Sequence, residues 1–262
     1  MGQMVSVKGG EVWAEDSGGS GGNGLPLILL HPGVADSRIW DGILPRLTER
    51  HRVIRYDARG YGRSPAPTAA FSLAGDLGAV LDHFRIDRAV LAGSSMGGAT
   101  AISLALDDPA RVAGLALVVP GITGRSDLLS EEFMAEFVKL AQGGDMEGLV
   151  SLLMHSSAAA GTGYDAEVRA HLLAVLPAWF ATQPHNVPDP PAFDRLGELD
   201  VPCALALGEL DQPSVVRCNE EMAERIPGCR LVRLHASDHF PTLREPDAVT
   251  DLILQTHAAA AG

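Results

Sequence analysis

The run RAVLAGSSMGG, residues 88–98, decides the fold of this chain. Residues 89–92 form a short and wholly apolar segment, which is typical of a strand that is buried on both faces. From Gly97 and Gly98 onward, small and apolar residues continue in a helical pattern. The chain must therefore reverse from strand to helix around Ser95.

The turn at Ser95 has the pattern Gly-x-Ser-x-Gly, with Gly93 and Gly97 two residues to either side. Glycine tolerates the strained backbone of such a nucleophile elbow and lets the helix approach the strand closely. The serine hydroxyl then stands clear of the sheet, and the Met96 N–H points toward the same space, where it could hold an oxyanion. A glycine-rich turn with an incidental serine is the alternative. Ser94 has the wrong offset from both glycines, so we interpret it as structural.

Strand and helix patterns alternate along much of the chain. Strand patterns lie at residues 25–30, 52–56, 112–119, 201–207 and 230–234, and those at 25–30 and 112–119 are typical of buried strands. Helical patterns lie at residues 37–49, where Asp36 can act as the cap, and at residues 72–84, 214–226 and 247–257. Residues 5–8 and 11–15 predict an edge hairpin. This alternation predicts an α/β fold with a mostly parallel, twisted sheet, helices on both faces and a ligand crevice beyond the carboxyl ends of the strands.

The alternation stops between residues 123 and 198. Two or more helical patterns, roughly at residues 130–156 and 164–182, follow one another there without a strand between them. A chain of 262 residues is long enough for one large domain with an insertion or for two small domains, and its composition favours the first. We therefore expect a core domain formed by residues 1–122 and 199–262, and a helical cap or lid at residues 123–198.

A base and an acid are expected near Ser95, because a serine hydroxyl is a weak nucleophile at neutral pH. His239 follows the last strand pattern and Asp211 follows the one before it. The resulting chain order of Ser, Asp and His is typical of a strand–turn–helix nucleophile site. We predict that Ser95, Asp211 and His239 form a catalytic triad, the alternative for His239 being a local turn contact.

Three neighbouring residues compete for these roles. His235 lies within or just after its strand, so its ring would point into the sheet or away from it. Glu209 and Asp238 are alternative acids. Asp211 is preferred because it lies at the start of its loop, whereas Asp238 is adjacent to the base and is expected to face the wrong way.

An oxyanion hole needs a second N–H beside that of Met96. The loop after the strand at residues 25–30 is the segment that can reach it. Pro32 has no N–H, so the candidate donors are Gly33 and Val34, unless this loop is an ordinary turn.

Taken together, these motifs resemble the α/β-hydrolase superfamily over essentially the whole chain. They are His31-Pro32-Gly33 with Trp40 downstream, residues 57–64, Gly93-Ser94-Ser95-Met96-Gly97, residues 208–211 and His239. The chain is most similar to small capped members, which include enol-lactonases, carbon–carbon bond hydrolases, haloperoxidase-like esterases and carboxylesterases. A serine nucleophile separates it from members that use aspartate. Pro32 stands where many members have glycine.

The resemblance implies a serine hydrolase that cleaves a small hydrophobic carboxylic ester, thioester or lactone through an acyl-enzyme on Ser95. An acyltransferase, a carbon–carbon bond hydrolase or a lyase on the same scaffold is the alternative, and a ligand-binding protein with little turnover is a second one. Trp179, Phe180 and Phe137 are candidate substrate contacts in the cap, although packing of the cap on the core is the more ordinary role for each.

The composition of the chain limits the classes of molecule that it is expected to bind. Acidic residues outnumber basic ones by 33 to 20, and no basic run occurs, so nucleic acid and membrane are poor partners. Three cysteines without C-x-x-C spacing, and histidines without H-E-x-x-H spacing, argue against a metal or a disulfide framework. We expect no cofactor, a small-molecule substrate, and a monomer or homodimer. The lack of a leader pattern and of an apolar run of ~18 residues predicts a cytoplasmic protein.

Overall fold

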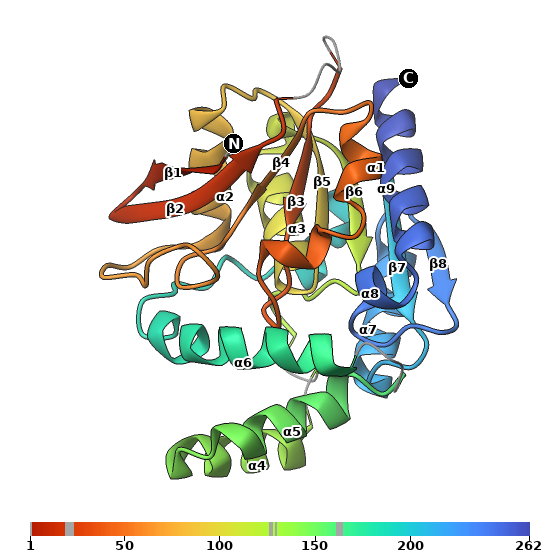
Figure 1. Cartoon of the computed structure of the whole chain (residues 1–262). Helices are drawn as coiled ribbons and strands as arrows, with labels where there is room; N and C mark the ends of the chain where they lie inside the picture. The colour runs from red at the N-terminus through yellow and green to blue at the C-terminus, as the bar shows by residue number, and fades with distance from the viewer. Residues whose placement is uncertain (1, 19–23, 126–127, 129, 161–164) are drawn as a thin grey trace.

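The computed structural model describes residues 2–18, 24–125, 128, 130–160 and 165–262. Their strands form an eight-stranded sheet in the order β1-β2-β4-β3-β5-β6-β7-β8, which Figure 1 shows at the centre of the molecule. The strands are β1 (Gly2–Val7), β2 (Gly10–Asp16), β3 (Leu27–Leu30), β4 (Val53–Tyr56), β5 (Ala89–Ser94), β6 (Val112–Val118), β7 (Cys203–Gly208) and β8 (Arg230–Leu234). The β1–β2 and β2–β4 pairs are antiparallel and the other pairs are parallel, so the predicted mostly parallel sheet is confirmed.

Helices cover both faces of the sheet. They include α2 (Leu73–His83), α3 (Met96–Asp107), α7 (Pro213–Arg225), α8 (Pro241–Arg244), α9 (Pro246–Ala261) and the short η2 (Pro109–Arg111). Ile28 and Leu30 of β3 join the core beneath α2, α3 and α7, while Leu27 and Leu29 join the core beneath α9. Successive side chains of a strand point to opposite faces, so a strand buried on both sides must be apolar throughout.

The helix predicted at residues 37–49 is interrupted. Ser37–Trp40 form a 3-10 turn, η1, whose start is capped by the Asp36 carboxylate, which accepts a hydrogen bond from the Arg38 N–H at 3.0 Å. The chain re-enters a helix only at α1 (Leu44–Thr48). Pro45 explains the break, because it has no N–H and is best accommodated in the first turn of a helix, where it lies in α1.

Three helices occupy the region predicted as a cap. They are α4 (Glu131–Gly143), α5 (Met146–Ser157) and α6 (Asp165–Thr182), and Figure 1 shows them as a layer beyond one end of the sheet. The succession of two or more helices agrees with the prediction, but the pattern at residues 130–156 forms two helices and not one. Gly144 ends α4 with a left-handed φ of 67°, which glycine adopts readily, and Asp145 caps α5.

The 3-10 segment η3 (Phe193–Glu198) then leads back to β7. The predicted helix start at residue 164 lies outside the described residues, and the division into core and cap stays a prediction. Within the ranges that the structure describes, no helix is long and apolar enough to cross a membrane.

Candidate active site

Ser95 lies at the tip of the turn between β5 and α3. Its φ of 47° and ψ of −110° are unusual for a residue with a side chain, and such a conformation costs about 1–3 kcal/mol. The flanking glycines are required by close packing. A Cβ on Gly93 would collide with the Gly97 carbonyl oxygen, and a Cβ on Gly97 would collide with the Leu30 carbonyl oxygen of β3. The strained turn therefore presents the Ser95 side chain beyond the end of the sheet.

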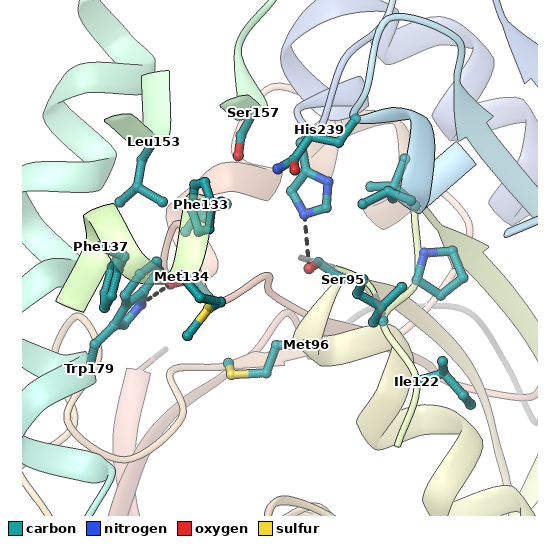
Figure 2. A pocket seen from close by; sticks show the side chains of 18 residues that line it. Ser95, Met96, Ile122, Phe133, Met134, Phe137, Leu153, Ser157, Trp179 and His239 are labelled. Atoms are coloured by element: carbon teal, nitrogen blue, oxygen red, sulfur yellow. Dashed lines mark hydrogen bonds between the residues drawn. The ribbon is translucent and has the colours of Figure 1, made fainter. Parts of the chain in front are cut away.

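Ser95, His239 and Asp211 form one hydrogen-bonded chain. The His239 Nε2 atom lies 2.9 Å from the Ser95 Oγ atom, and the His239 Nδ1 atom lies 2.6 Å from Asp211 Oδ2. Figure 2 shows the His239 ring directly over the Ser95 hydroxyl. Asp211 follows β7 and His239 follows β8, so three loops at the carboxyl end of the sheet supply the three side chains. The structure brings together the residues that the sequence predicted as a triad.

The protonation of His239 is set by opposing effects. Burial alone would lower the pKa of its imidazole, but the charge of Asp211 and the hydrogen bond to it, together with the charge of Asp238, raise the pKa above its ordinary value. In the neutral ring, a proton on Nδ1 is donated to Asp211. The Nε2 atom is then free to accept the proton of the Ser95 hydroxyl.

The three alternative residues are engaged elsewhere. His235 has a largely exposed side chain, and its Nδ1 atom lies 2.5 Å from Glu209 Oε2, so these two residues pair with each other at the surface. Asp238 is fully buried. Its carboxylate accepts hydrogen bonds from Arg244 at 2.9 Å and from the Phe240 N–H at 2.9 Å. The preference for Asp211 over Glu209 and Asp238 agrees with these positions.

The loop after β3 faces Ser95 and is held by His31. The buried ring of His31 accepts a hydrogen bond from the Ala58 N–H at 2.9 Å, so its Nδ1–H donates to the Pro32 carbonyl at 2.8 Å. Burial lowers the pKa of His31, which keeps the ring neutral for this arrangement. A Cβ built on Gly33 would lie 3.8 Å from the Met96 Cβ atom, so this loop contacts the nucleophile turn.

The three predicted oxyanion donors stand beside the cavity without an acceptor. Gly33, Val34 and Met96 all line the cavity that contains Ser95. In the part of the chain that the structure describes, none of their backbone N–H groups donates a hydrogen bond to another residue. N–H groups that face a cavity unpaired are available to a ligand oxygen.

The cavity over Ser95 has a volume of about 500 Å³ and a mainly apolar lining. Ser95 and His239 lie on one side, and the opposite wall comes from the helices beyond the sheet (Figure 2). The apolar lining includes Ile122, Leu128, Phe133, Met134, Phe137, Leu153 and Trp179. His239 is the single titratable side chain among the described lining residues, and Gln212 and Ser157 add polar groups.

The predicted substrate contacts divide into two groups. Phe137 and Trp179 line the cavity, whereas Phe180 has an exposed side chain and borders a neighbouring hollow instead. Sequence reasoning missed Ile122 and Gln212. Both lie four residues beyond a strand end, Ile122 after β6 and Gln212 after β7, so their position in the chain was the available signal.

In the described ranges, no cluster of three or more histidine, cysteine, aspartate or glutamate side chains could hold a metal ion.

The fold and the site together define a class of protein: a mostly parallel α/β sheet with a serine elbow, a histidine and a buried aspartate on loops at one end. The family model for the alpha/beta hydrolase fold matches residues 26–161, which is about half of the chain. The chain belongs to the α/β-hydrolase fold family, and the family predicted from the sequence is confirmed.

Several known proteins are similar to this chain. A solved structure described as Est816, an N-acyl homoserine lactone degrading enzyme, is 29% identical with a TM-score of 0.80, over 97% of this chain and 99% of that one. The enol-lactonase from Burkholderia xenovorans LB400 is 25% identical with a TM-score of 0.82, over 98% of this chain and 100% of that one.

Curated relatives match over a shorter region. A putative carbamate hydrolase RutD of Variovorax paradoxus (strain S110) is 44% identical over 97 residues, which cover 35% of this chain and 36% of that protein. The chain thus matches about a third of the length of such relatives.

Proposed function

We propose that this protein is a serine hydrolase that cleaves a carboxylic ester, thioester or lactone through an acyl-enzyme on Ser95. The observation that carries the proposal is the chain of hydrogen bonds from Ser95 through His239 to Asp211, placed in an apolar cavity. Membership of the α/β-hydrolase fold family and the likeness to Est816 and to an enol-lactonase support it.

In the first half of the reaction, the Ser95 Oγ atom attacks the substrate carbonyl carbon while His239 Nε2 takes the serine proton. Asp211 stabilises the imidazolium that forms. The carbonyl oxygen becomes an oxyanion and accepts hydrogen bonds from the Met96 N–H and from the N–H of Gly33 or Val34. The carbon–oxygen or carbon–sulfur bond then breaks, and the leaving group takes the proton from Nε2.

In the second half, water enters and loses a proton to His239 Nε2 as its oxygen attacks the acyl carbon. The tetrahedral intermediate collapses, the bond to Ser95 Oγ breaks, and the serine recovers its proton. The free acid leaves, and its carboxyl group ionises in water.

The cavity favours an uncharged, apolar acyl group. Apolar side chains form most of its wall, and no described lining residue besides His239 can carry a charge. An isolated carboxylate or ammonium group would be desolvated there without a partner, which is costly. Esters and lactones of neutral hydrophobic acids are therefore the proposed substrates.

Hydrolysis of p-nitrophenyl esters and simple lactones of graded acyl length tests the proposal. We expect turnover by the unmodified protein and its loss in Ser95→Ala. Ser94→Ala is the matched control, because Ser94 is buried at the end of β5 and is interpreted as structural. Turnover retained in Ser95→Ala would contradict the acyl-enzyme. Lack of turnover in all three proteins would favour a carbon–carbon cleaving or lyase reaction, or a binding role.

A further inference from the structure

Trp179 links helix α6 to the loop that carries two candidate oxyanion donors. Its indole Nε1–H donates a hydrogen bond to the Gly33 carbonyl oxygen at 2.5 Å, across 146 positions of sequence. Figure 2 shows this bond on the side of the cavity opposite Ser95. The Phe137 ring lies beside the indole ring, with 5.8 Å between the ring centroids. The Trp179 side chain therefore lines the cavity and also makes a hydrogen bond to the Gly33 loop.

Gly33 needs an external restraint. With no side chain, glycine has the widest choice of backbone conformations. The carbonyl before it, that of Pro32, already accepts hydrogen bonds from the His31 ring at 2.8 Å and from the Ala35 N–H at 3.3 Å. The carbonyl of Gly33 itself is held by Trp179.

Fixing these two carbonyls also fixes the two candidate donors. A trans peptide unit is planar, and its N–H points opposite to its C=O. The Pro32 carbonyl shares a peptide unit with the Gly33 N–H, and the Gly33 carbonyl shares one with the Val34 N–H. His31 orients the first unit from inside the core. Trp179 orients the second and limits rotation about Gly33.

We propose that Trp179 is a positioning residue for the oxyanion hole: its indole N–H holds the Gly33 backbone in the orientation that presents the loop N–H groups to the reacting carbonyl. This inference rests on the proposed function, because the oxyanion in question is the one that forms when Ser95 attacks the substrate carbonyl. Helix α6 must then be seated on the core for the oxyanion hole to be complete.

Tyr61 lies near Gly33 and Trp179, but it carries no negative charge that would draw the Trp179 indole N–H away from the Gly33 carbonyl. Its hydroxyl oxygen lies 3.8 Å from a Cβ position built on Gly33. Burial raises the pKa of Tyr61, and a hydrogen bond with Trp179 opposes this only in part. The phenol therefore stays protonated at neutral pH.

The test replaces Trp179 by phenylalanine, which keeps an aromatic wall and removes the N–H. Hexylboronic acid serves as a transition-state probe, because it forms a tetrahedral adduct with the Ser95 oxygen. n-Hexanol serves as a ground-state probe, because it only fills the cavity. In Trp179→Phe we expect kcat for a hexanoate ester to fall by about 10- to 100-fold. The affinity for hexylboronic acid should fall by a similar factor and that for n-hexanol far less.

Phe137→Leu is the control for packing. Phe137 lines the same cavity and contacts the indole ring, but the variant keeps the indole N–H. Phe137→Leu is expected to lower the affinity for both probes by the same factor. The ratio of the two affinities then stays that of the unmodified protein. A Trp179→Phe protein that retains both kcat and the boronic acid affinity overturns the inference while the proposed function stands. An unmodified protein that cleaves no ester or lactone overturns both.

A measurement on the unmodified protein applies even if Trp179→Phe fails to fold. The indole N–H signal of Trp179 in an NMR spectrum should exchange slowly with solvent and should move when hexylboronic acid binds Ser95. A signal that exchanges as fast as that of a free indole and does not respond to the probe overturns the inference.

Discussion

Replacing Asp211 by asparagine removes one charge and keeps the shape of the side chain. The carboxylate lies 2.6 Å from His239 Nδ1, and both side chains are largely shielded from solvent. Opposite unit charges about 4 Å apart attract by about 4 kcal/mol at an effective dielectric constant of about 20. Because the imidazolium forms only during the reaction, this attraction is lost from the transition state. Each ~1.4 kcal/mol is a factor of ten in rate, so kcat should fall by about 10³-fold.

The same substitution should move the pH profile. His239 acts as a base only when neutral, so kcat/KM rises as the pH rises through the pKa of His239 in the free enzyme. Asp211 holds that pKa above its ordinary value against the effect of burial. Without the carboxylate the effect of burial remains, and the acid limb of the profile should shift to lower pH.

The assay is steady-state hydrolysis of an uncharged ester across the pH range, for the unmodified protein, Asp211→Asn and Glu209→Gln. Glu209→Gln is the matched control, because that exposed carboxylate pairs with His235 and not with the His239 ring. Its acid limb should stay in place. If Asp211→Asn keeps kcat within about tenfold of the unmodified protein and leaves the acid limb where it was, Asp211 does not act on His239.

Two further predictions concern stability. Arg244→Met leaves the buried Asp238 carboxylate without its cationic partner, which lies at 2.9 Å. The free energy of unfolding, measured by urea denaturation, should fall by about 3–5 kcal/mol. A loss under about 1 kcal/mol would mean that the pair is not buried in solution. Gly97→Ala should prevent stable folding or lower the thermal midpoint sharply, because the added Cβ meets the Leu30 carbonyl, whereas Gly78→Ala in α2 has open space and should raise stability by up to about 1 kcal/mol. Equal thermal midpoints for the two alanine variants would argue against the close approach at Gly97.

The sequence was most informative where the chain leaves the sheet. Ser95 and Asp211 each follow an apolar run that could be recognised by its length and its flanking residues, and His239 follows the last strand pattern of the chain. In a parallel sheet the carboxyl ends of the strands lie at one edge, so position in the chain predicts proximity in space. The placement of these three residues therefore needed no knowledge of how the helices pack.

The orientation of the helices beyond the sheet was harder to predict from the sequence, for a physical reason. Adjacent residues of a helix point about 100° apart, so the rotation of α6 decides which of Trp179 and Phe180 faces the cavity, and the sequence does not reveal that rotation. Tertiary packing decides it. The breaks at Gly144 and Pro45 were readable in principle, since glycine ends helices and proline restarts them. The periodic apolar residues on either side of each break masked them.

Contacts between the helices and the loops around Ser95 have a kinetic consequence. The backbone N–H of His239 donates to the Ser157 carbonyl at the end of α5 at 3.0 Å, and the backbone N–H of Ala160 donates to the Asp238 carboxylate, next to His239, at 3.1 Å. Trp179 of α6 holds the Gly33 carbonyl. These helices therefore support the base on one side of the cavity and the oxyanion loop on the other. Substitutions that loosen α5 or α6 should lower kcat as well as raise KM, because they displace groups that act in the transition state and not only the wall that binds the substrate.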